Sequence, residues 1–126
     1  MRDFQDLEVW QAAFAMALAV YELTDLFPPS ERFGLSAQLQ RAAVSAPSNI
    51  AEGHGRNRNT EFYRFCEIAM GSTCEAECQL LIARGRGYVS DEQLAPAMAH
   101  VHKTKRLLRG FMQYLSRPSQ EPGARS

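Results

Sequence analysis

The segment from Gln40 to Arg56, QRAAVSAPSNIAEGHGR, limits what this chain can fold into more than any other part of it. Small and apolar residues recur in the segment at helical spacing, and the pattern continues through Pro47 before it stops at Gly53 and Gly55. Because proline has no amide hydrogen and its ring clashes with the carbonyl group four residues earlier, we expect the helix to bend at Pro47. One of the two glycines is then expected to end the helix in a left-handed conformation.

The same periodicity predicts four helices, over about residues 7–27, 35–53, 59–86 and 90–116. The connections between them are short, which favours helices that run antiparallel to their neighbours in sequence. The predicted fold is therefore all-α, an antiparallel up-down-up-down four-helix bundle over residues 1–116. Residues 117–126 are poor in apolar side chains and are expected to form a mobile C-terminal tail.

Polar residues indicate where these helices begin. Asp6 and Ser30 are suited to be the N-caps of the first and second helices. Ser90, with Gln93 three residues later, has the spacing of a capping box for the fourth. Pro96 lies too deep for the first turn, so we expect this helix either to start later or to be kinked in its first two turns.

The first predicted helix carries two apolar stripes on roughly opposite sides. One stripe consists of Leu7, Trp10, Phe14, Leu18 and Tyr21, and the other of Val9, Ala13, Met16, Val20, Leu23 and Phe27. A monomeric four-helix bundle buries one stripe per helix, so the second stripe indicates contact with another copy of the chain. We assign this contact to the second set, and the predicted oligomer interface consists of Val9, Ala13, Met16, Val20 and Leu23.

Charge is distributed unevenly along the 126 residues, although the formal net charge is zero. Residues 1–83 hold 6 Lys/Arg against 11 Asp/Glu, and residues 84–126 hold 8 against 3, which indicates an anionic partner for the C-terminal third. Two basic clusters supply the candidate nucleic-acid-binding residues: Arg56, Arg58 and Arg64 around the second turn, and Lys103, Arg106 and Arg109 on the fourth helix. The alternative interpretation is a solvated helix face that is paired with acids of a neighbour.

The three cysteines, Cys66, Cys74 and Cys78, all fall in the third predicted helix. Their odd number argues against a secreted disulfide framework and favours the reducing cytoplasm, and we expect all three to be buried thiols. The sequence has no Cys-x-x-Cys motif, no histidine pair at chelating spacing and no Glu-x-x-His motif. We therefore predict no metal and no cofactor.

Catalytic and membrane-spanning patterns are missing as well. There is no nucleophile elbow and no glycine-rich phosphate loop, so a protein without enzymatic activity is predicted. The longest uncharged apolar run, from Ala12 to Tyr21, is too short to span a bilayer, and we do not expect the first residues to act as a signal peptide.

Structural roles are predicted for Pro47, Asn49, Glu52 and Gly53. Asn49 and Glu52 lie three residues apart on one side of the helix, next to the expected bend, where backbone groups lack partners. We expect the two side chains to tie this helix to the next one or to a neighbouring subunit.

Several of these motifs resemble one known family. RAAVSAPSNIAEGHGR, EFYRFCEIAMGS, QLLIARGRGY and FQDLEVWQAA are similar to the four-helix-bundle proteins named after the intervening sequences of 23S ribosomal RNA, over roughly residues 4–115. The resemblance implies a left-handed up-down bundle that assembles as a homo-oligomer, most often a pentameric ring. A more distant similarity to the accessory bundle proteins of diversity-generating retroelements implies contact with RNA or with a reverse transcriptase. The chain departs from the family at Gln40, where a basic residue is common, and also at Ala46 and His54.

Together these observations predict a cytoplasmic, homo-oligomeric helical scaffold without enzymatic activity. Its expected partners are other copies of itself and RNA or a nucleic-acid-processing protein, which it would contact through the basic clusters. The alternative is a purely protein-binding adaptor that has no nucleic-acid role.

Overall fold

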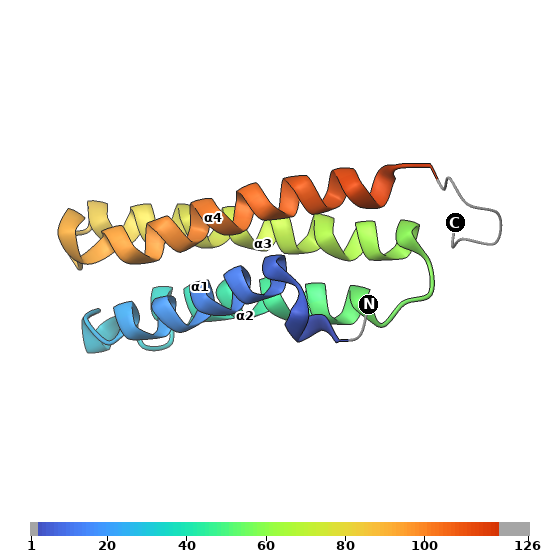
Figure 1. Ribbon diagram of the computed structural model, residues 1–126. Coiled ribbons are helices and arrows are strands. Elements are labelled where there is room, and N and C mark those ends of the chain that lie inside the picture. Colours follow the sequence, from blue (N-terminus) through green and yellow to red (C-terminus); the bar gives the residue numbers. More distant parts are fainter. Residues whose placement is uncertain (1–2, 119–126) are drawn as a thin grey trace.

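The computed structural model describes residues 3–118, which form four α-helices lying side by side (Figure 1). The helices are α1 (Glu8–Thr24), α2 (Leu35–His54), α3 (Asn59–Gly85) and α4 (Asp91–Ser116), with two short 3-10 helices, η1 (Phe4–Asp6) and η2 (Pro29–Glu31). No strand occurs in the described part of the chain. The predicted all-α fold with four helices is confirmed, whereas most of the predicted C-terminal tail lies outside the described residues.

In Figure 1, α1 and α2 lie in one layer of the bundle and α3 and α4 in the other. Polar contacts near the turns join helices that follow one another in the sequence. Gln40 of α2 donates a hydrogen bond to the hydroxyl group of Thr24 at the end of α1 (2.9 Å). Arg84, near the end of α3, lies 3.6 Å from the carboxylate of Asp91 at the start of α4.

Small and medium-sized apolar side chains fill the core between the four helices. The largest of the completely buried residues include Met16 on α1, Leu39 and Ile50 on α2, Leu80 on α3 and Leu108 on α4. On α2 the core side also includes the alanines Ala42, Ala43 and Ala46. Such small side chains let neighbouring helix axes approach closely.

The residues predicted to form the oligomer interface lie in this core, so that assignment is wrong. Val9, Ala13, Met16, Val20 and Leu23 are buried within a single chain, three of them completely. Their side of α1 packs against α2 and α4. The other stripe of α1 remains at the surface, with Phe14, Leu18 and Tyr21 exposed by 44%, 54% and 46%.

The first helix begins later than predicted. Asp6 belongs to η1, whose N-cap is Asp3, and α1 starts at Glu8. Leu7 takes the N-cap position of α1 and makes no side-chain hydrogen bond there. The chain therefore enters α1 from a preceding 3-10 turn, and the expected cap at Asp6 does not form.

Glu31 takes the capping role that was predicted for Ser30. Ser30 lies within η2, and α2 starts only at Leu35. The Leu35 amide donates a hydrogen bond to Oε1 of Glu31 (2.9 Å), and the Tyr88 hydroxyl donates one to Oε2 (2.7 Å). These two bonds, that from the Leu35 amide most of all, hold the pKa of the Glu31 carboxyl group below its ordinary value.

The end of α2 differs from the prediction. The helix continues through Pro47 to His54, as expected, but Gly55 follows it in a right-handed conformation (φ −76°). Gly53 lies inside the helix and is buried, because the Phe62 ring of α3 packs directly on it. Among residues 3–118 the one glycine with a positive φ is Gly87 (77°), after α3.

Gly87 ends α3 in a Schellman motif. Its amide donates to the carbonyl oxygen of Arg84 (2.9 Å), and the next amide, that of Tyr88, donates to the carbonyl oxygen of Ala83 (2.9 Å). A positive φ is required at this position, and glycine adopts it without a steric penalty.

The start of α4 follows the predicted capping box. The Ser90 hydroxyl accepts a hydrogen bond from the Gln93 amide, and the Gln93 side chain accepts one from the Ser90 amide. The helix is continuous from Asp91 through Pro96, so it does not start later than the capping box.

None of the helices in the described region combines the length and the hydropathy that a membrane span requires.

Candidate functional site

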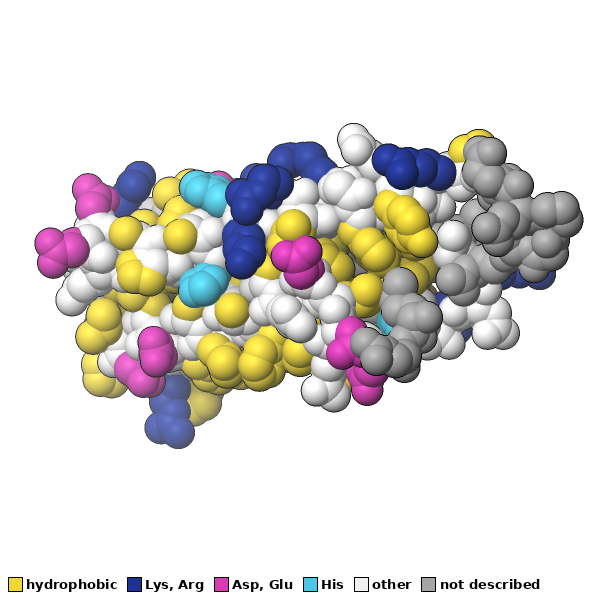
Figure 2. Space-filling model, in the orientation of Figure 1, with side chains coloured by type: hydrophobic (Ala, Val, Ile, Leu, Met, Phe, Trp, Pro, Cys, Tyr) yellow, Lys and Arg dark blue, Asp and Glu magenta, His cyan; other side chains and the backbone are white. Residues whose placement is uncertain are grey.

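Three basic side chains on the outer arc of α4 form the first candidate site, here called the α4 basic strip. Lys103, Arg106 and Arg109 follow one another at three-residue spacing and are exposed. None of them has an acidic side chain within ion-pair distance among residues 3–118. Figure 2 shows basic side chains gathered along this helix. Cations that are not neutralised by neighbouring acids are suited to hold phosphate groups by charge.

A hollow of about 350 Å³ between α1 and α4 opens beside the strip. Its lining includes Arg106, Gly110, Phe111 and Tyr114 of α4 and Glu8 of α1. The rings of Phe111 and Tyr114 stack with their centroids 6.0 Å apart, and Tyr114 is exposed. This group of a cation and two aromatic rings was not predicted from the sequence. The four-residue steps from Arg106 to Gly110 and Tyr114 were the signal that could have found it.

The second basic cluster, at the turn between α2 and α3, is partly neutralised. Nη2 of Arg56 lies 3.0 Å from Oε2 of Glu52, and its guanidinium group lies over the Phe65 ring, 4.8 Å from the centroid. Arg58 and Arg64 are exposed and have no acidic partner in the described region. Arg56 is therefore engaged within the chain, and two of the three predicted cations remain available.

Aromatic contacts show how the two basic clusters are placed relative to each other. The Phe62 ring near the start of α3 meets the Phe111 ring near the end of α4, with centroids 5.1 Å apart. The turn that carries Arg58 and the C-terminal end of the α4 basic strip therefore share one end of the bundle, which is the right-hand end in Figure 1.

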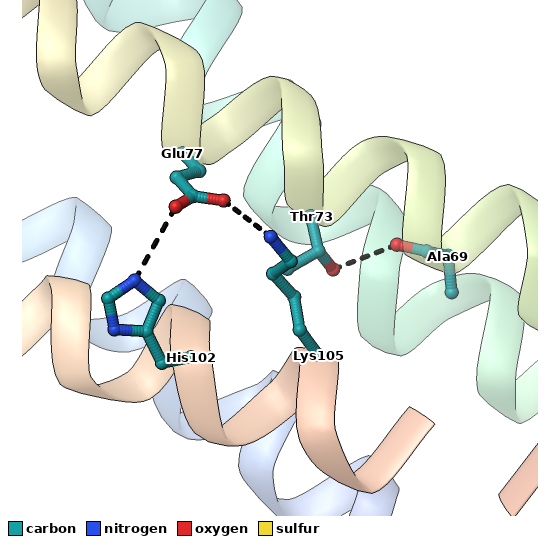
Figure 3. Close-up of polar contacts among 5 residues, drawn as sticks. All are labelled: Ala69, Thr73, Glu77, His102 and Lys105. Atoms are coloured by element: carbon teal, nitrogen blue, oxygen red, sulfur yellow. Dashed lines mark hydrogen bonds and ion pairs between the residues drawn. The ribbon is translucent and has the colours of Figure 1, made fainter. Parts of the chain in front are cut away.

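Lys105, also on α4, is neutralised inside the groove between α3 and α4 (Figure 3). Its Nζ lies 2.9 Å from Oε1 of Glu77, and Nε2 of His102 lies 3.4 Å from Oε2 of the same carboxylate. The Thr73 hydroxyl nearby donates to the carbonyl oxygen of Ala69 (2.8 Å) and does not join this network. The hydrogen bond from Lys105 holds the pKa of Glu77 below its ordinary value, and the contact with His102 adds to this effect.

We expect Glu77→Gln to destabilise the protein at neutral pH, by up to about 1 kcal/mol, and to have less effect in acid. A carboxyl group with a lowered folded-state pKa stabilises the fold above its unfolded-state pKa, and this contribution is lost as the pH falls through the folded-state value. Urea unfolding at several pH values between about 7 and 3 measures the difference from the unmodified protein, which should shrink with falling pH. Glu75→Gln, which removes an exposed carboxylate without a basic partner, is the matched control. A difference that stays constant with pH would contradict the assignment.

Asn49 links α2 to α3 through a neighbouring serine. Its Nδ2 donates to the carbonyl oxygen of Ser45 (2.9 Å) and lies 3.0 Å from the Ser45 hydroxyl, which in turn lies 2.8 Å from the Ser72 hydroxyl of α3. Glu52, by contrast, is exposed and pairs with Arg56 in the turn that follows α2. Of the two side chains expected to tie the helices together, Asn49 therefore takes part in an inter-helix network within the chain.

An apolar groove of about 380 Å³ runs along the outer side of α1 and α2, and we call it the α1–α2 groove. It is lined by Phe4, Trp10, Phe14, Ala17, Leu18, Tyr21, Val44, Pro47, Ser48 and Ala51. The Trp10 and Phe14 rings stack along it, with centroids 4.9 Å apart. This surface belongs to the first apolar stripe of α1, and not to the stripe that we predicted to contact another copy.

The cysteines differ in their surroundings. Cys66 is buried, which raises the pKa of its thiol to about 12, whereas Cys74 and Cys78 are exposed. The expectation of buried thiols is therefore wrong for two of the three. Cys66 shares the core side of α3 with Thr73 and Leu80 at seven-residue spacing, and the other two point away from it. No group of three metal-ligating side chains occurs within the described region.

The comparisons with known proteins agree with this fold. The family model described as 23S rRNA-intervening sequence protein matches residues 5–110. A similar solved structure is a protein of unknown function from the S23 ribosomal protein family of Bacteroides thetaiotaomicron VPI-5482, with a TM-score of 0.77 and 21% sequence identity over 83% of this chain and 98% of that one. No curated protein matches the chain. Since the family model covers most of its helices, the chain belongs to the 23S rRNA-intervening sequence protein family.

Proposed function

We propose that this protein is a homo-oligomeric scaffold without enzymatic activity, which binds RNA through the α4 basic strip. The proposal rests mainly on one observation: Lys103, Arg106 and Arg109 stand exposed along one helix without acidic partners in the described region. The unit of assembly is the antiparallel up-down-up-down bundle, and the family resemblance favours a pentameric ring. The free thiols suit the reducing cytoplasm as its compartment.

The α1–α2 groove supports self-association. Burying an exposed aromatic or leucine side chain stabilises a complex by roughly 1.5–3 kcal/mol for complete burial, and three such side chains, Phe14, Leu18 and Tyr21, stand about half exposed in one row. A second copy of the chain would cover this row. Repetition of the basic strip around a ring would then add weak phosphate contacts into a stronger overall affinity.

We expect Leu18→Glu to reduce the solution mass to that of a single chain, because the carboxylate would be desolvated in the middle of the contact. Light scattering coupled to gel filtration measures this mass. Leu26→Glu, which changes a leucine of similar exposure outside the groove, should leave the assembly intact. A wild-type protein that stays a single chain at high concentration would contradict the proposed assembly.

The surroundings of the strip favour RNA with unpaired nucleotides. Arg106 shares its hollow with the stacked rings of Phe111 and Tyr114. Bases of single-stranded segments stack on aromatic side chains, while the phosphates are held by nearby cations. Arg58 and Arg64 at the same end of the bundle would extend the basic surface.

We expect the wild-type protein to bind a stem-loop RNA with an affinity that falls about 20- to 40-fold when salt rises from about 50 to about 200 mM, as three phosphate contacts would give. Replacing Lys103, Arg106 and Arg109 together by alanine should lower the slope of log affinity against log salt by about 2 to 3. Fluorescence anisotropy of labelled RNA measures both quantities.

Lys105→Ala is the matched control, because its charge is already offset by Glu77 and its loss should change the slope little. Failure to bind RNA at low salt, with assembly preserved, would overturn the RNA part of the proposal. The protein would then be a purely protein-binding adaptor, which the apolar α1–α2 groove also favours.

A further inference from the structure

The geometry points to a dithiol site on α3 that binds a trivalent organic arsenical. The arsenic atom of this ligand would bridge the sulfur atoms of Cys74 and Cys78. Both thiols are free and exposed, and they lie one helical turn apart on the same side of α3. This binding site is separate from the α4 basic strip and from the α1–α2 groove, and it does not depend on the proposed function.

Helix geometry favours a one-atom bridge over a disulfide bond. Side chains four residues apart on an α-helix have Cβ atoms about 5–6 Å apart. A disulfide requires a Cβ separation of about 3.5–4.5 Å, so Cys74 and Cys78 cannot form one without distorting α3. An arsenic atom inserted between the two sulfur atoms lengthens the link, and the helix can keep its form.

The surroundings of the two thiols fit a soft ligand with an apolar substituent. Cys74 and Cys78 line a hollow of about 430 Å³ together with Glu77, Leu81 and Ile82. The exposed Leu81 and Ile82 offer an apolar surface on which an aromatic ring of the ligand can pack. Glu77 is the one charged residue of the lining, and both its oxygens already face Lys105 and His102.

The number of sulfur donors determines which thiol-binding ligand fits this site. A tetrahedral zinc site requires four ligands, and no group of three metal-ligating side chains occurs among residues 3–118. Two thiolates without a further ligand match a centre that already carries one carbon substituent and needs two sulfur atoms. A monosubstituted trivalent arsenical has this requirement.

The reaction with phenylarsine oxide is a condensation without a change of oxidation state. Two arsenic–sulfur bonds form, the bonds from arsenic to its oxygen break, and the two thiol protons leave with that oxygen as one molecule of water. Cys66 does not compete, because it is buried on the core side of the same helix.

The test uses the full-length protein and phenylarsine oxide under native conditions. Intact-mass spectrometry should show one phenylarsine group per chain, and thiol titration should show the loss of the two accessible thiols. Because two linked contacts act together, removing the phenylarsine group should require a roughly 100-fold higher monothiol concentration than in a variant with one of the two cysteines. A dithiol competitor should remove the group from the wild-type protein. The variants Cys74→Ser and Cys78→Ser should each lose this resistance.

Cys66→Ala is the matched control and should keep the bridged adduct. Should this core variant fail to fold, peptide mapping of the wild-type adduct replaces it and should place the group on Cys74 and Cys78. The inference is overturned if wild-type protein takes up no phenylarsine, if either surface variant keeps monothiol-resistant binding, or if the mapped group includes Cys66.

Discussion

Replacing Met16 by alanine should lower the free energy of unfolding by about 2–5 kcal/mol, the range for truncating a large apolar side chain in a packed core. Met16 is completely buried and is among the largest side chains of the core cluster. The cost combines the lost burial of the side chain with the cavity that remains, since close-packed neighbours relax only in part. For a domain of this size such a loss is a large fraction of the total stability.

Leu18→Ala, two residues along the same helix, is the matched comparison. Leu18 is about half exposed, so its truncation should cost no more than about 0.5 kcal/mol in the isolated chain. Urea unfolding of both variants at low protein concentration, where contacts between copies contribute little, measures the two values. If Leu18→Ala proved the more costly of the two under these conditions, the assignment of the two α1 stripes to core and surface would have to be reversed.

Gly53→Ala should destabilise the protein by about 1–3 kcal/mol, although alanine is the better helix former. A Cβ atom at Gly53 would lie 2.6 Å from Cδ1 of Phe62 and 2.9 Å from Cβ of Phe65. Phe62 cannot move aside easily, because it is buried and its ring contacts those of His54 and Phe111. The steric cost therefore outweighs the gain in helix propensity, which is about 1 kcal/mol.

Gly71→Ala tests the same substitution where nothing is crowded. Gly71 lies in the middle of α3, and a Cβ atom there would have no neighbour within 4 Å. We expect this variant to be more stable by about 0.5–1 kcal/mol, because alanine loses less backbone entropy on folding. Circular dichroism during urea unfolding gives both free energies. The two variants should differ in sign, and a stabilised Gly53→Ala variant would show that α2 and α3 are not in close contact there.

Gly53 and Gly87 show why the local sequence pattern could not distinguish a glycine that packs between two helices from a glycine that ends a helix. Gly53 and Gly55 both follow a helical stretch, and either is a plausible helix end by the usual rules. In the structure Gly53 is a contact point between α2 and α3, and the left-handed glycine is Gly87 at the end of α3. The distinction depends on the position of Phe62, which comes from another helix.

The candidate site likewise combines features that can be predicted from the sequence with features that depend on the folded chain. The number of helices, the capping box at Ser90 and the concentration of positive charge on α4 follow from residue spacing within single segments, because periodicity and capping are local properties. The pairing of Lys105 with Glu77, by contrast, joins residues that are 28 positions apart. Sequence spacing predicts Lys103, Arg106 and Arg109 as a cluster, but only the folded chain shows that these three lack acidic partners in the described region while Lys105 has one.

The all-α class, the four helices and the two apolar stripes on α1 can be predicted from the amino-acid sequence, since each depends on interactions within a few residues. Which stripe is buried depends on the packing of the folded chain, because both stripes have helical periodicity and apolar composition. Val9, Ala13, Met16, Val20 and Leu23 pack against α2 and α4 in the core, and Phe14 and Leu18 on the other stripe remain at the surface. That choice depends on the shapes of facing helices, which no single segment contains.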